Sequence, residues 1–179
     1  MKKAFVDVNK LNKLEAVGLS RKICKFAEES GEIMQVICRY VGMKANKMSP
    51  EEMREEALGE VADIVQNSFC IASEFNITLK EITYGISIKR MYANGKHFAK
   101  EKTLEDLGCN FYIKSGKLTE SAHSNVTDLN AYNVKLKIQE VLVSIFAIAA
   151  KLGIKLEEIE PKILEKDKKW LKRINSNLF

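Results

Sequence analysis

The sequence predicts an all-α protein, organised as a single helical bundle of about five helices. Only 2 prolines and 9 glycines occur among its 179 residues, which leaves few positions for turns and favours long helices. Apolar residues recur at helical spacing in most of the chain, and capping boxes mark two expected helix starts. An apolar pattern from the middle of the chain also recurs near its end, which predicts a degenerate helix-turn-helix repeat inside the bundle.

Composition is typical of a globular protein, with 46% hydrophobic and 30% charged residues. No apolar run approaches the roughly 18 residues that a membrane-spanning helix requires, so no membrane partner is expected. The net charge of +5 comes from interspersed acids and bases, which suits an anionic ligand but does not require nucleic acid. Nucleic acid is not expected as a partner. Four cysteines without a CxxC pair predict reduced, buried thiols and a cytoplasmic location.

Periodicity and capping signals place two long helices in the first part of the chain. Residues 1–13 show no clear period and are expected to form a short lead-in. Helical spacing runs from about residue 19 to 41, and Gly42 is a plausible stop. Ser49-Pro50-Glu51-Glu52 combines an N-cap serine, a proline at the first helical position and a capping-box glutamate. A second helix should therefore run from there to about Phe75.

A third helix and an irregular segment should follow. Thr78-Leu79-Lys80-Glu81 repeats the capping box, and its helix should reach about Tyr92 and end at Asn94-Gly95. Residues 96–126 carry no clear period and are expected to form an irregular connector, in which Ser115-Gly116 could turn a small hairpin. Whether so long a connection acts as a lid or is partly mobile stays open at this point.

Two more helices are expected at the end of the chain. The first should run from Thr127-Asp128 to about Leu152, and the second to about Arg173, with Pro161 kinking or restarting it. Lysines make the last segment basic, which we interpret as a solvated helix face near a carboxyl terminus. They are Lys162, Lys166, Lys168, Lys169 and Lys172.

Two pairs of acids are the strongest candidates for chemistry. Glu29 and Glu32, and likewise Glu60 and Asp63, are three residues apart, so each pair lies on one helix face. If the two helices pack antiparallel, four carboxylates converge. Such a cluster is tolerable only around a cation, and an all-oxygen cage suits magnesium or manganese.

A glycine inside each acidic stretch supports this interpretation. Gly31 precedes Glu32 and Gly59 precedes Glu60, although glycine within a helix costs about 1 kcal/mol relative to alanine. A close approach of backbone, metal or substrate would justify that cost.

Three polar residues are candidates for substrate binding. Asn67 follows Asp63 by four residues on the same helical face and could contact a base or sugar, or simply be solvated. Lys89 and Arg90 could bind phosphate, for which the arginine fork is well shaped, or could serve only as surface charges.

The two acidic motifs resemble a known family. EExxE, as Glu28, Glu29 and Glu32, followed by ExxD, as Glu60 and Asp63, is similar to the motif pair of the all-alpha nucleoside triphosphate pyrophosphohydrolases. That superfamily includes MazG, the dimeric dUTPases and dCTP pyrophosphatases, and phosphoribosyl-ATP pyrophosphohydrolase. Residues 72–82 also look like the family's passage into its next helix, and the resemblance covers roughly residues 10–95.

The resemblance implies a function and a set of roles. Glu29, Glu32, Glu60 and Asp63 would be the magnesium ligands, and Glu29, ahead of Glu32, would be the general base. An activated water would attack the α-phosphorus of a nucleoside triphosphate and release pyrophosphate. A MazG-like bundle and a homo-oligomer, a dimer or a dimer of dimers, would be expected, in the cytoplasm.

The internal repeat then divides the expected single domain, 1–179, into unequal halves. A shift of 77 positions aligns Phe69 with Phe146 and Ile77 with Ile154, but places Lys137 and Glu140 at the positions of Glu60 and Asp63. Residues 1–95 would be the catalytic, metal-binding half and 127–179 a degenerate structural half. Two alternatives remain: a base-specific pyrophosphatase similar to dUTPases or dCTPases, and a helical scaffold or weak nucleic-acid binder without enzymatic activity.

Overall fold

The structure is a computed structural model that describes residues 1–14, 18–42, 48–123 and 128–175. Within these ranges the chain forms eight helices and no strand, so the predicted all-α class is confirmed. None of these helices is both long and apolar enough to cross a bilayer. The helices are α1 Lys2–Leu14, α2 Leu19–Tyr40, α3 Pro50–Glu74, α4 Leu79–Ile82, α5 Ile88–Phe98, α6 Leu104–His123, α7 Asp128–Lys151 and α8 Leu156–Asn175.

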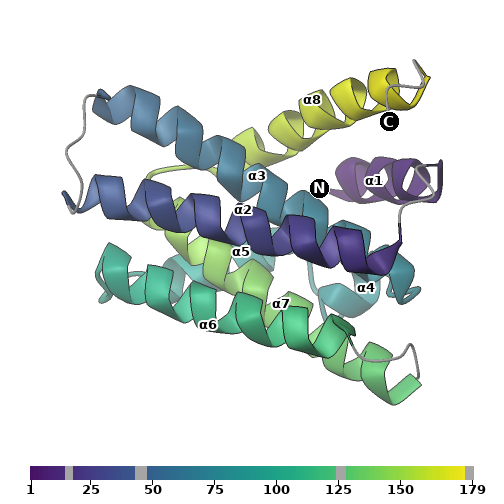
Figure 1. Cartoon of the computed structure of the whole chain (residues 1–179). Helices are drawn as coiled ribbons and strands as arrows, with labels where there is room; N and C mark the ends of the chain where they lie inside the picture. Colours follow the sequence, from purple (N-terminus) through teal and green to yellow (C-terminus); the bar gives the residue numbers. More distant parts are fainter. Residues whose placement is uncertain (15–17, 43–47, 124–127, 176–179) are drawn as a thin grey trace.

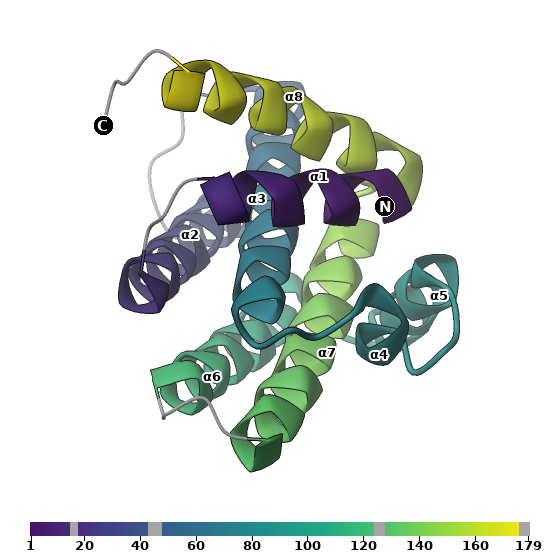
Figure 2. The same ribbon diagram turned by 90° about the vertical axis from the view of Figure 1, so that its right-hand side faces the viewer.

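Helix α3 lies at the centre of the bundle. It contacts α2, α7, α1 and α8, and Figure 2 shows it between α2 and α7, beneath the pair formed by α1 and α8. Helices α2 and α3 run side by side in opposite directions, with α6 packed against α2, and α7 packed against both α3 and α6 (Figure 1). Because neighbours surround it, α3 buries most positions from Ala57 to Ala72 rather than a single stripe.

The capping boxes begin helices where the sequence predicts them. The Ser49 hydroxyl accepts from the Glu52 N–H at 3.1 Å, and the Glu52 carboxylate accepts from the Ser49 N–H at 2.7 Å. Thr78 and Glu81 form the same box at the start of α4. These reciprocal bonds satisfy amides that a helix start would leave unpaired.

The two copies of the internal repeat share one turn geometry. Ile77 N–H donates to the Ala72 carbonyl at 2.9 Å, and the equivalent bond from Ile154 to Ala149 is 2.8 Å. The intervening residues, Asn76 and Gly153, both have positive φ, 54° and 71°. The same helix termination also occurs at Tyr84, where Gly85 N–H donates to the Lys80 carbonyl at 2.8 Å, so the shared turn agrees with the repeat but is not specific to it.

The expected number of helices was wrong, and residues 1–13 account for part of the difference. They form α1 rather than a lead-in, because Ala4, Phe5 and Val8 share one face and are buried. The Phe5 ring packs edge-on against Phe69 of α3, with 5.1 Å between ring centroids.

The predicted third helix is also wrong, because it is divided into α4 and α5. Tyr84 and Gly85 adopt positive φ, 52° and 73°, which ends α4, and the Ser87 hydroxyl caps α5 by accepting from Arg90 N–H at 3.2 Å. Gly95 does not end a helix. It lies buried inside α5, where a Cβ would come within 2.8 Å of the Val143 carbonyl oxygen on α7.

Residues 104–123 form helix α6 rather than an irregular connector or hairpin. Leu107, Phe111, Ser115, Leu118 and Ala122 make its buried face, and the Ser115 hydroxyl donates within the helix to the Phe111 carbonyl at 2.8 Å. Polar residues between these positions made the helical spacing of the buried residues difficult to recognise in the sequence.

The last two helices follow the prediction more closely. Helix α7 is confirmed to Lys151, although Thr127, its expected first residue, lies outside the described residues. Helix α8 runs through Pro161 without restarting.

Of the four cysteines, only Cys70 is buried. Cys38 is half-buried, and Cys24 and Cys109 are exposed, so the expectation of buried thiols was largely wrong.

Candidate metal centre

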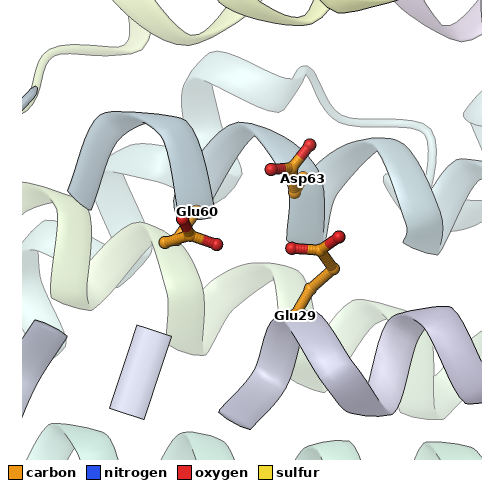
Figure 3. A group of neighbouring side chains, drawn as sticks. All are labelled: Glu29, Glu60 and Asp63. Atoms are coloured by element: carbon orange, nitrogen blue, oxygen red, sulfur yellow. The ribbon is translucent and has the colours of Figure 1, made fainter. Parts of the chain in front are cut away.

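Helices α2 and α3 bring three carboxylates together. Glu29 projects from α2, and Glu60 and Asp63 project from successive turns of α3 (Figure 3). One oxygen from each lies within 4.8 Å of the others. The predicted convergence across an antiparallel helix pair is therefore confirmed for these three residues, and Glu29 is only 4% exposed.

The cluster is short of positive charge. Burial, followed by the charges of Asp63, Glu29 and Glu32, raises the pKa of Glu60 to about 8, against the influence of Lys166. Burial is also the largest cause that raises the pKa of Glu29 and of Asp63. Glu32, one turn further along α2, is half-buried and lies outside the group of three, and its charge adds to the repulsion.

Two lysines partly balance these acids. Lys166 of α8 pairs with Asp63 and donates to the Gly59 carbonyl at 3.0 Å, while the Lys25 ammonium lies 2.6 Å from Oε1 of Glu29. In contrast, Oε2 of Glu60 is buried and has no hydrogen-bond partner among the described residues.

This arrangement fits a hard divalent cation. The converging ligands are all carboxylate oxygens, the donors that magnesium and manganese prefer. A cation would also satisfy the unpartnered oxygen of Glu60, since a buried acceptor without a partner is costly. Glu29, Glu60 and Asp63 would hold it, with Glu32 close by.

Asn67 lies one turn beyond Asp63 on α3 and is half-buried. Its side-chain amide donates to the Asp63 carbonyl at 2.9 Å. The amide is therefore near the acidic cluster but is engaged with its own helix.

Lys89 and Arg90 lie elsewhere in the chain. Both are exposed on α5, and Lys89 lines a pocket together with Glu157 at the start of α8. Lys166 comes nine residues after Glu157, about 13 Å along the helix at 1.5 Å per residue. After the turn at Tyr84 and Gly85, α5 packs against α7. Lys89 and Arg90 are therefore not brought to the carboxylates of the same chain.

Two lysines at the site were not predicted from the sequence. Lys25 lies four residues before Glu29, a spacing that places both on one helix face and could have revealed the pair. Lys166 was grouped with the solvated lysines at the end of the chain, but its side chain is only 25% exposed. Its contact with Asp63 spans 103 positions, and local spacing carries no signal for such a contact. The only sign of this lysine in the sequence was the repeat, which aligns Lys166 with Lys89, itself a candidate phosphate-binding residue.

The two helical glycines have no close backbone neighbour. A Cβ at Gly31 would meet nothing within 4 Å, and one at Gly59 would meet only the Lys166 ammonium at 3.9 Å. No packing among the residues that the structure describes explains Gly31 and Gly59.

Comparisons of the chain with protein-family models, curated proteins and solved structures gave no match. The observations that bear on function are therefore the carboxylate geometry and the EExxE and ExxD motifs that produce it.

Proposed function

We propose that this protein is a magnesium-dependent nucleoside triphosphate pyrophosphohydrolase. It would convert a nucleoside or deoxynucleoside triphosphate and water into the monophosphate and pyrophosphate. The proposal is carried by the placement of Glu29, Glu60 and Asp63, whose carboxylate oxygens lie within 4.8 Å of one another. Their origin in an EExxE helix followed by an ExxD helix supports it.

The three carboxylates supply the oxygen ligands that a magnesium-dependent hydrolysis needs. A magnesium ion, when bound, neutralises charge on phosphate oxygens and makes water more acidic. Glu29, Glu60 and Asp63 would hold the ion between α2 and α3, with Glu32 as a further carboxylate beside it. Manganese would serve in its place, because it accepts the same oxygen ligands.

Glu29 is the best-placed general base. Burial raises the pKa of its carboxyl, which brings proton affinity closer to that required at neutral pH. Lys25, 2.6 Å away, orients the carboxylate. Glu29 takes a proton from water as the water oxygen bonds to the α-phosphorus. The bond from that phosphorus to the bridging oxygen breaks, and its electron pair leaves with pyrophosphate.

Binding of the rest of the nucleotide involves the other candidates. Asn67 is close enough to the cluster, through its bond to the Asp63 carbonyl, to contact the base or sugar. Lys89 and Arg90 would bind phosphate only in a homo-oligomer in which a second copy brings its α5 to the site. Contacts outside the acidic cluster would select the nucleobase of the substrate. Experiment therefore has to distinguish an enzyme that accepts many nucleotides from one with dUTPase-like or dCTPase-like specificity.

The test is a panel of common ribo- and deoxynucleoside triphosphates, assayed for pyrophosphate release with magnesium and with manganese. We expect turnover that Glu60→Gln reduces by at least about 100-fold, because a ligand charge is lost from the metal site. Glu55→Gln is the matched control, since Glu55 lies on the same helix but pairs with Lys162 away from the cluster. Absence of release from every nucleotide, with salt-sensitive binding of DNA or RNA, would instead identify a scaffold or nucleic-acid binder.

A further inference from the structure

The Lys166 ammonium takes up a carboxylate that a metal ion would need. It reaches from α8 to Asp63 and to the Gly59 carbonyl at 3.0 Å. Lysine is a point charge on a flexible stem, and its ammonium has no acceptor capacity. An ammonium and a divalent ion beside the same carboxylate repel each other.

The surroundings of the contact favour displacement of the side chain rather than of the helix. Helix α8 is anchored by Ile159 and Ile163, both fully buried, and by Arg54 of α3, which pairs with Glu158 at 2.7 Å. Lys166 lies beyond these anchors and is partly exposed. Its stem can therefore swing outward while α8 remains in place.

We propose that Lys166 is an internal counter-ion that competes with the divalent cation for Asp63, so that cation binding releases Lys166. The inference rests on the proposed metal site. It adds that the degenerate half of the chain acts on the site of the first half. In the absence of metal, Lys166 limits the repulsion among Glu29, Glu60 and Asp63, and metal affinity is lowered by the energy of that contact.

The experiment compares manganese and magnesium affinities, measured by calorimetric titration of the intact chain without nucleotide. Lys166→Met should bind each ion about five- to tenfold more tightly than the wild type, because no ammonium competes for Asp63. Lys166→Arg keeps the positive charge and should bind close to wild-type affinity. Lys162→Met is the matched control: Lys162 lies one turn earlier on α8, its ammonium is 2.6 Å from exposed Glu55, and the charge of Asp63 acts on it less than those of Glu55 and Glu165, so any gain in affinity should be much smaller than in Lys166→Met.

Thermal unfolding provides a second measurement. Without metal, Lys166→Met should unfold at a lower temperature than the wild type, and saturating manganese should raise that temperature more than in the wild type. Circular dichroism checks the helical content, and Lys166→Gln replaces Lys166→Met if the latter does not fold.

Three outcomes would overturn the inference. Equal or weaker metal binding by the neutral variants, while the wild type binds metal, would remove the competition and leave the proposed hydrolase intact. An equal gain in metal affinity in Lys162→Met would show that the loss of any nearby positive charge causes the effect, rather than the loss of the contact with Asp63. No divalent binding by any variant would remove the metal site, and with it this inference.

Discussion

Glu60 links proton binding and metal binding at the level of a single residue. Its pKa of about 8 means that the metal-free protein holds a proton there at neutral pH. A carboxylate must lose its proton to become a ligand. Protons and divalent ions therefore compete for Glu60.

Metal affinity should consequently increase with pH. Between pH 6 and pH 8 the apparent magnesium affinity is expected to rise, by at most about tenfold per pH unit for one competing proton, and to level off above pH 8. Calorimetric titration in two buffers of different ionisation enthalpy measures both the affinity and the protons released. An affinity independent of pH over this range would contradict proton competition at Glu60.

Asp167 gives a pH dependence of stability away from the carboxylate cluster. The side chain is 5% exposed, and it accepts from Gln66 Nε2 at 2.6 Å while its second oxygen has no partner. Burial, with a smaller contribution from Asp7, raises its pKa from 3.8 to about 6. Because the folded-state pKa lies above the unfolded value, stability is lost as pH rises from about 4 to above 6.

Asp167→Asn should remove that loss. The variant is expected to exceed the wild type in unfolding free energy by roughly 1–2 kcal/mol at pH 7.5, after allowance for solvent screening, and to match it near pH 4. Urea denaturation of both proteins in the presence of a chelator measures the difference. A difference that stays constant from pH 4 to pH 7.5 would rule out titration of Asp167.

Local spacing was sufficient to find the acidic cluster, and the four-residue spacing of Lys25 and Glu29 could have revealed one counter-ion, but it could not reveal Lys166. Glu60 and Asp63 share a face whatever the rest of the chain does, since a helix alone places residues three apart together. Lys166 meets Asp63 only because α8 crosses α3, which is a property of the tertiary structure. The position of Lys89 could not be predicted for a related reason, because α4 ends at Tyr84 and Gly85 and Lys89 lies on a separate helix, α5.

Among the elements, α5 and α7 approach each other closely at Gly95. A Cβ there would lie 2.8 Å from the Val143 carbonyl oxygen and 2.9 Å from the Ala147 nitrogen. Gly95→Ala should therefore destabilise the protein by about 1–3 kcal/mol, since backbone atoms cannot yield as a side-chain end can.

Gly116→Ala is the matched control for that prediction. Gly116 lies in the exposed middle of α6, with nothing within 4 Å of a Cβ, so alanine should stabilise the helix by up to about 1 kcal/mol. Chemical denaturation of both variants measures the two signs. If the two substitutions had the same effect, the α5–α7 contact would not explain Gly95.

Long helices with strong capping signals were predictable, whereas short or broken ones were not. Helix α3 follows from Ser49, Pro50 and Glu52, because the cap and the first turn are specified locally. Gly95 looks like a helix stop in sequence, but tertiary packing uses its missing side chain instead. Sequence cannot separate these two uses of glycine.

At the scale of the whole molecule, the two halves of the chain share one core. Helix α3 is covered by α7 and α8, α2 by α6, and α1 by α8. The carboxylates of the first half are thus positioned by packing against the second half.

A fragment of residues 1–98 should therefore not fold alone. Without α6, α7 and α8, the buried faces of α2 and α3 would be exposed to water, and too little apolar surface would remain covered to offset chain entropy. Circular dichroism and thermal unfolding should show no cooperative transition, in contrast to the intact chain. A fragment that unfolds cooperatively and binds manganese would show that the first half is independent.

The repeated turn has a further consequence for how the chain responds to ions. On α7, at the positions equivalent to Glu60 and Asp63, Lys137 lies 3.2 Å from Glu140, so that stretch neutralises itself. In its counterpart on α3, Asp63 instead pairs with Lys166 of α8, 103 positions along the chain. If the first copy binds divalent ions as proposed, its net charge would change with their concentration. The second copy would keep the same charge and would contribute only to the fold.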